Sequence, residues 1–250
     1  MGINHFIGAG DRNSIAIGNA DGLTTGESVI VGGFYNKVAG SGIYAVIGGG
    51  TGNTNKAWSG TIADGHLNFI DGDDNYSVEV ATIGGGSRNT VTASAATIPG
   101  GYGANASHWG ESAYAAGYFG AVGDAQSSLY VARRTTTSAT PTELFLDDSG
   151  ARMTIPSGST WIFEIQVAAR STNLSPNKSA GYTAKGVIDN IGGTTSFVAG
   201  SVTVLGEDDM NWDLQLEADD TNDALVLKGV GAASTTIRWV ATIRTTEVSQ

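Results

Sequence analysis

The sequence predicts an all-β protein: a Gly-rich β-roll, which is a form of β-solenoid, followed by an antiparallel β-sandwich that is jelly-roll-like. Three observations carry this prediction. The first half repeats a short Gly-rich unit, the second half alternates apolar and polar residues, and neither half shows helical periodicity. Glycine supplies 37 of the 250 residues, and each Gly inside a helix would cost about 1 kcal/mol.

The composition changes near residue 126. Residues 1–126 hold 27 of the 37 Gly, and residues 127–250 hold the other 10. Acidic residues exceed basic ones in both halves, by 10 to 4 and then by 14 to 9, so the net charge of −11 is spread over the chain. We therefore predict two domains, a repeat β-roll over residues 1–126 and a β-sandwich knob over residues 127–250.

The repeats of the first half share the pattern Ile-Gly-x-Gly-x-x-Asn, which starts at Ile7, Ile47 and Ile83. We predict that each unit forms two short strands, with Gly and Asn supplying the positive φ angles of the corners. From Ile17 the apolar residues that open the units step by 14, 16, 15, 21, 15 and 18 residues, so the two longest steps indicate insertions at residues 71–75 and 108–109. The predicted anchors of the repeats are Ile7, Ile17, Val31, Ile47, Ile62, Ile83 and Ile98, and the last step ends at Ala116.

The second half contains about nine segments of strand-like alternation separated by turn signals. In the last of them, Ile237, Trp239, Ala241 and Ile243 alternate with more polar residues. The predicted strands are Leu129–Arg134, Thr142–Asp147, Arg152–Ile155, Trp161–Arg170, Tyr182–Asp189, Ser196–Leu205, Trp212–Ala218, Ala224–Val230 and Thr235–Val248.

The repeat units of the first half resemble those of a known protein family. The x-Ala-x-Ile-Gly-Gly-Gly-x-x-Asn units resemble the left-handed β-roll head of trimeric autotransporter adhesins, over roughly residues 3–126, and related repeats occur in bacteriophage fibre proteins. The resemblance implies that three rolls pack side by side in a homotrimer.

The second half carries a more specific likeness over about residues 127–250. It resembles a domain at the C-termini of phage tail-fibre, tailspike and other virion appendage proteins, and no catalytic residues come with it. The segments that carry the likeness are 132–137, Thr140-Pro-Thr142, Ile155-Pro156, 161–170, 202–204, 212–214, 218–222 and 237–242.

Charge and motifs exclude several function classes. An acidic chain lacks the basic patch that nucleic-acid binding needs, and no apolar run reaches the roughly 18 residues of a membrane span. The sequence has no Cys, no His pair at metal-ligand spacing and no Gly-x-Ser-x-Gly. We therefore predict no catalytic residues, no metal site, no cofactor and no enzymatic activity.

Two acidic loops are the segments of the sequence most similar to a cation site. Asp71-Gly-Asp-Asp-Asn75 begins like a calcium loop but lacks its Gly at position six and its closing Glu, so we favour a loop corner. Glu207-Asp208-Asp209 would suit a cation or a sugar hydroxyl, and we favour a solvated loop between strands there as well.

Aromatic residues give the best indication of binding. Trp58, His108 and Trp109 lie in coils where most side chains are small, and exposed rings are common platforms for sugar faces. The competing interpretation is that these rings fill gaps between coils or subunits. Trp161, Trp212 and Trp239 lie in strands and are predicted to pack in the core.

The function predicted from these observations is structural and adhesive. The chain is expected to be a trimeric virion fibre protein whose distal knob contacts a host surface glycan or receptor, with other virion proteins as partners. Three alternatives stay open: a bacterial trimeric surface adhesin, a phage polysaccharide depolymerase, and a capsid-decorating fibre.

Overall fold

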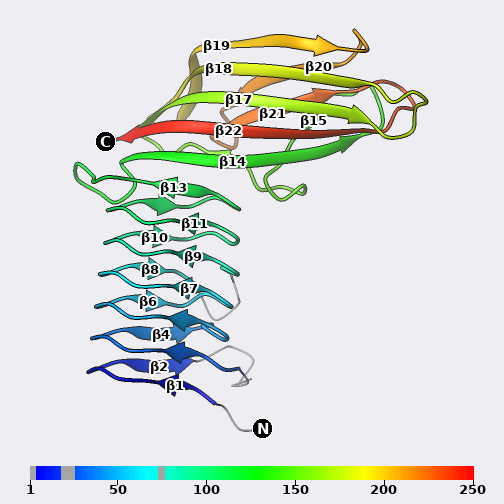
Figure 1. Cartoon of the computed structure of the whole chain (residues 1–250). Helices are drawn as coiled ribbons and strands as arrows, with labels where there is room; N and C mark the ends of the chain where they lie inside the picture. Colours follow the sequence, from blue (N-terminus) through cyan, green and yellow to red (C-terminus); the bar gives the residue numbers. More distant parts are fainter. Residues whose placement is uncertain (1–3, 18–25, 73–76) are drawn as a thin grey trace. The chain divides into compact units, whose positions relative to one another are not determined.

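The computed structural model describes residues 4–17, 26–72 and 77–250, and the chain divides into two compact units, Met1–Gln126 and Ser127–Gln250. All the elements assigned in the described residues are β-strands (Figure 1). The prediction of an all-β chain with a β-solenoid is therefore confirmed. Within the same residues, no helix has the length and apolar character needed to cross a membrane.

The first unit is a stack of coils whose strands form two parallel sheets, as the blue-to-green part of Figure 1 shows. Strands β1 to β13 alternate between the sheets, so each coil contributes one short strand to each. The first sheet contains β1 (Phe6–Ile7), β3 (Val29–Ile30), β5 (Val46–Ile47), β7 (Thr61–Ile62), β9 (Thr82–Ile83), β11 (Thr97–Ile98) and β13 (Ser112–Tyr114). The second contains β2 (Ser14–Ile17), β4 (Lys37–Gly40), β6 (Thr54–Asn55), β8 (Phe69–Ile70), β10 (Thr90–Val91) and β12 (Asn105–Ala106).

One column of isoleucines forms the centre of the solenoid core. Ile30, Ile47, Ile62, Ile83 and Ile98 pair in register along the first sheet and are fully buried. Val38, Ile70 and Val91 of the second sheet, together with small residues such as Ala45, Ala81 and Ala96, fill the rest of the interior. Because each coil buries its apolar face against the next, the core continues from coil to coil.

Two of the predicted anchors lie elsewhere. Val31 is 52% exposed, and its neighbour Ile30 occupies the buried column; successive strand residues face opposite ways, so a shift of one residue exchanges inside for outside. Ile17 belongs to β2 in the second sheet, opposite Gly40. Ile7 pairs with Ile30 at the first described coil and is 44% exposed.

The predicted insertion at His108–Trp109 is absent. Thr97 pairs with Ser112, so residues 108–109 take the places that Ala93 and Ser94 hold in the coil before. The anchor of this coil is the buried Ala113, and the expected anchor Ala116 instead bridges Tyr102 in a different column. The longest step of the repeat, from Ile62 to Ile83, contains the Asp71–Asn75 loop, of which residues 73–75 lie outside the described residues.

The repeated Asn builds a ladder of side-chain hydrogen bonds. The Oδ1 of each Asn accepts the backbone N–H of the Asn one coil further on, at 2.9–3.1 Å. Each Nδ2 donates to the carbonyl four residues earlier and to a Gly carbonyl of another coil, as Asn53 does to Gly49 and Gly65 at 3.0 Å. The members are Asn13, Asn36, Asn53, Asn68 and Asn89, and Ala104 ends the ladder by donating its N–H to Asn89.

At the corners of the ladder, the positive φ angles belong to the residues around the asparagines. The residue before the Asn is left-handed, as in Tyr35 (φ 57°) and Leu67 (φ 55°). The Gly three residues after each Ile of the motif is required by close approach: a Cβ on Gly50, whose φ is 81°, would lie 2.0 Å from the carbonyl oxygen of Gly65. The expectation that Asn supplies the left-handed corners was wrong, since its side chain satisfies buried backbone groups instead.

The second unit is antiparallel and has much longer strands. One sheet follows the order β14-β22-β17-β18-β19, and in the other β21 is flanked by β20 on one side and by β15 and β16 on the other. The strands are β14 (Ala125–Thr136, which begins in the last two residues of the first unit), β15 (Thr142–Glu143), β16 (Met153–Thr154), β17 (Ser159–Ser171), β18 (Ser179–Ile191), β19 (Thr194–Glu207), β20 (Asp213–Asp219), β21 (Ala224–Val230) and β22 (Ile237–Ser249).

Aromatic residues dominate the core of this unit. Trp161, Trp212 and Trp239 are at most 2% exposed, as their strand positions predicted. Trp239 lies 6.1 Å from Tyr182 and 6.2 Å from Trp212 between ring centroids, and its indole N–H donates to Thr136 Oγ1. One continuous apolar cluster draws residues from both sheets, so the strands of the unit close around a single core.

Candidate functional site

Trp58 and Trp109 lie in the same column of corner residues on the solenoid. Trp58 bridges Glu79 in the next coil, the carbonyl of Glu79 accepts the N–H of Ala95, and the carbonyl of Ser94 accepts that of Gly110. The column therefore runs Trp58, Glu79, Ser94, Trp109, one residue per coil. At the usual spacing of parallel strands the two Trp backbones are about 14 Å apart. We call this column the tryptophan edge.

Each corner of this edge contains a left-handed residue, and its two Trp rings are exposed to different degrees. The residue that follows each column member is left-handed, as at Ser59 (φ 54°) and Gly110 (φ 64°). Trp109 is 42% exposed. Trp58 is half-buried because its ring meets that of Tyr44 edge-on, at 6.3 Å between centroids. Glu79, also half-buried, is the charged residue between the two Trp in the column.

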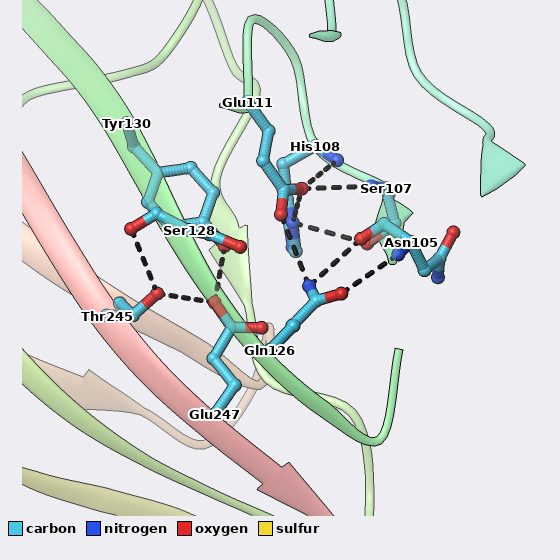
Figure 2. Close-up of polar contacts among 9 residues, drawn as sticks. All are labelled: Asn105, Ser107, His108, Glu111, Gln126, Ser128, Tyr130, Thr245 and Glu247. Atoms are coloured by element: carbon cyan, nitrogen blue, oxygen red, sulfur yellow. Dashed lines mark hydrogen bonds and ion pairs between the residues drawn. The ribbon is translucent and has the colours of Figure 1, made fainter. Parts of the chain in front are cut away.

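His108 does not share this exposure. It is 7% exposed, and its Nδ1 lies 3.0 Å from Oε2 of Glu111, which is 1% exposed (Figure 2). The same oxygen accepts the N–H groups of Ser107 and His108 at 2.9 and 3.0 Å. Gln126 completes the group: its Nε2 lies 3.5 Å from Glu111 Oε1. The structure therefore brings Trp58 and Trp109 to one edge and places His108 inside, where it supports the corner that carries Trp109.

This buried pair replaces two alanines of the repeat. His108 and Glu111 take the inward positions that Ala93 and Ala96 hold in the coil before. A buried ionisable pair needs several hydrogen bonds to offset its desolvation, and here backbone N–H groups and an amide provide them.

Carboxylates of the acidic loops form ion pairs and hydrogen bonds within the chain. Asp71 pairs with Lys56 at 3.3 Å. A hydrogen bond from Lys178, at 2.8 Å, and others from Asn211 lower the pKa of Asp209. Burial, together with the nearby Glu207 carboxylate, raises the pKa of Tyr182 well above its ordinary value. Among the residues that the structure describes, no group of three His, Asp or Glu side chains is placed to hold a metal ion.

The second unit has a groove that the sequence analysis missed. It is a hollow of about 460 Å³ on the solvent face of the sheet β14-β22-β17-β18-β19, and a second hollow of about 420 Å³ shares Glu164, Lys185 and Ser201 with it. The first hollow is lined by Leu129, Glu164, Ile165, Gln166, Thr183, Ala184, Lys185, Ser201, Thr203, Thr242 and Arg244. The available signal was the polar member of each alternation, since these polar residues share the solvent face of the sheet.

Comparison with known proteins finds solved structures only. No known protein family matches the sequence, and no curated protein matches it. Structural neighbours are phage tailspikes. The tailspike of Acinetobacter baumannii bacteriophage Fri1, a capsular polysaccharide depolymerase, aligns over 91% of this chain and 50% of its own length, with 9% identity and a TM-score of 0.30. The tailspike of Acinetobacter baumannii phage AM24 aligns over 99% and 57%, with 10% identity and a TM-score of 0.26.

The comparison corrects one prediction. The expectation that the protein has no enzymatic activity is contradicted, because the neighbours are tailspikes and that of phage Fri1 is a depolymerase. The sequence carries no catalytic motif of adjacent residues, and carboxylates that come together only in the folded protein, as in glycosidases, leave no such motif. The chain spans about half to three-fifths of the length of these tailspikes.

Proposed function

We propose that the chain is part of a homotrimeric phage tail appendage that attaches to a glycan of the host surface. The observation that carries the proposal is the tryptophan edge, where Trp58 and Trp109 share one side of a rigid stack of coils. Aromatic rings offer a flat apolar face on which the C–H groups of a sugar ring pack. Two such rings about 14 Å apart suit an extended glycan that lies along the solenoid.

The repeat architecture supports a fibre role. Each coil extends the stack without a change of fold, so the unit is stiff along its axis. The sequence resemblance to adhesin heads and phage appendages supports assembly as a trimer and a place in the virion beside other virion proteins. In this proposal the second unit is the β-sandwich knob.

The tryptophan edge can be tested by binding of the full chain to encapsulated host cells. We expect Trp58→Ala and Trp109→Ala each to weaken binding about tenfold, which corresponds to about 1.4 kcal/mol, and the double variant to weaken it further. Tyr35→Ala is the matched control, because Tyr35 is an exposed aromatic residue (49%) in a different column of corners. Unchanged binding by the double variant would remove the tryptophan edge as the contact surface.

Two further measurements complete the test. Light scattering should give a native mass three times that of the 25.5 kDa chain, and a monomer would contradict the trimer. Reducing ends released from purified capsule would show that the appendage cleaves the glycan that it binds.

A further inference from the structure

The solvent face of the long sheet in the second unit carries a concentration of positive charge. Arg170 on β17, Lys185 on β18, and Arg238 and Arg244 on β22 all occupy exposed, outward positions of three adjacent strands. Glu164 is the exposed acid among them, opposite Arg244 on one side and Lys185 on the other. This excess of cations stands out in a chain whose net charge is −11.

Basic residues elsewhere in the unit are engaged differently. Arg152 pairs with Glu143 and Lys178 with Asp209, both at 2.8 Å, and Lys228 pairs with Glu217. In the part of the chain that the structure describes, none of the four cations on the sheet face lies within 4.0 Å of a carboxylate. These four charges are therefore available to an external anion.

The arrangement of the cations brings two like charges close together within the chain. Arg170 lies directly opposite Arg238 in the antiparallel register, and like charges in that position repel each other. The polar contact of Arg170 is a neutral one, with Ser179 Oγ at 3.2 Å. An anionic ligand would relieve this repulsion.

The groove supplies hydrogen-bonding groups between the charges. Gln166, Thr183, Ser201, Thr203 and Thr242 line the hollow of about 460 Å³ together with Lys185 and Arg244. This volume falls within the usual range of ligand sites. Hydroxyl and amide groups can both donate to and accept from sugar hydroxyls, and the Glu164 carboxylate can accept from them.

The distance along the sheet indicates an extended ligand. Glu164 and Arg170 lie on the same strand, so the two groups of cations are about 20 Å apart at the usual rise per residue. The second hollow continues the groove from Glu164 in the opposite direction, away from Arg170, past Ile162, Val187 and Ala199, which add apolar surface. A single small anion would meet only part of this surface.

We propose that this sheet face binds an anionic polysaccharide whose sugars carry carboxylate groups. Glu164 and the hydroxyl- and amide-bearing side chains of the hollow can hydrogen-bond the many hydroxyl groups of such a ligand, which the backbone of duplex DNA lacks. The inference rests on the proposed function for the nature of the ligand, a host glycan. The site itself lies in the other unit and needs neither Trp58 nor Trp109.

The test compares Lys185→Glu/Arg244→Glu with a variant of equal charge. Lys37→Glu/Arg88→Glu is the matched control, because it makes the same change in net charge at exposed positions of the solenoid. The probes are polygalacturonate, neutral dextran and duplex DNA, with affinities measured for the full chain at two salt concentrations. We expect polygalacturonate to bind most tightly, the sheet-face variant to lose at least tenfold, and the control to stay within twofold.

Several outcomes would overturn the proposal. These are failure of the parent chain to bind polygalacturonate, equal affinity for dextran, tighter binding of DNA, or an equal loss in the control. A changed native mass of the sheet-face variant would also overturn it, by showing that the face is a contact between copies of the chain. Circular dichroism checks folding, and Lys185→Gln/Arg244→Gln provides a milder variant if the charge reversal unfolds the unit.

The two proposals fail separately. Trp58→Ala/Trp109→Ala should keep its affinity for polygalacturonate, and Lys185→Glu/Arg244→Glu should lose it. If polygalacturonate binding depends on the Trp pair alone, the sheet-face site is wrong and the tryptophan edge stands. If it depends on Lys185 and Arg244 while cell binding ignores the Trp pair, the tryptophan edge is wrong and the sheet-face site stands.

Discussion

The two units of this chain stabilise β-structure by different means. In the first unit most strands are two residues long, all pairing is parallel, and the core consists of small or medium side chains. In the second unit the long strands reach 12–14 residues, the pairing is antiparallel, and three Trp pack in the core. The solenoid relies on repetition of one backbone geometry, whereas the second unit relies on large side chains that meet from distant strands.

This difference determines how each unit responds to a substitution in its core. A solenoid coil contacts mainly its two neighbours, so damage at one coil interrupts a column of hydrogen bonds and side chains. In the second unit one aromatic residue touches several strands at once.

Ile83→Asp should cause the greatest loss. Ile83 is fully buried between Ile62 and Ile98, and an unpaired carboxylate there should cost more than about 4 kcal/mol. Hydrogen exchange should show lost protection in β7, β9 and β11 and retained protection in β17. Val80→Asp is the control, since Val80 is 52% exposed in the same coil. A parent-like exchange pattern for Ile83→Asp would contradict the assigned core.

Trp239→Ala should destabilise the second unit and leave the solenoid intact. Truncating a fully buried aromatic side chain typically costs about 3–5 kcal/mol, and this one also leaves Thr136 Oγ1 without its indole donor. Urea unfolding followed by hydrogen exchange of each unit measures the effect. Val240→Ala, at the neighbouring exposed position (46%), should change stability little. Equal losses in both units would show that they do not unfold separately.

Asn53→Ala tests the hydrogen-bond ladder. The change removes the donor to the carbonyls of Gly49 and Gly65 and the acceptor for the N–H of Asn68. We expect a loss of about 3 kcal/mol, because buried backbone groups are left without partners. Asn13→Ala, at the more exposed first described coil, should cost less than about 1 kcal/mol. Similar losses at both positions would argue against a cumulative ladder.

The smallest expected quantity is the coupling between His108 and Glu111, measured with a double change that restores the repeat. His108→Ala and Glu111→Ala alone should each cost about 2 kcal/mol, because each leaves a buried polar partner. The double variant resembles the preceding coil, with Ala93 and Ala96, so its loss should fall below the sum by about 1 kcal/mol or more. Thermal unfolding of the parent, the two single variants and the double variant gives the stabilities for a double-mutant cycle. Strictly additive losses of stability would show that the pair is not coupled.

Repetition and alternation made most of the fold predictable. The Gly-rich period predicted a solenoid, and all nine segments predicted as strands in the second half contain strands. The failures were local. Val31 fits the Ile-Gly pattern because Gly32 follows it, and only the pairing of β3 with Val46–Ile47 shows that Ile30 is the buried residue. His108 looked like an exposed aromatic residue because the sequence does not show that Glu111 folds back onto it.

The secondary structure class, the repeat and the aromatic core could be predicted from the sequence, since they follow from side-chain size and period along the chain. The tertiary structure decided which side chains share a surface. Trp58 and Trp109 lie far apart in the sequence but on one edge, because each coil returns the chain to the same side. Lys185 and Arg244 flank Glu164 because antiparallel pairing places β18 and β22 on either side of β17. Register between distant strands is a property of the folded chain, and both candidate sites depend on it.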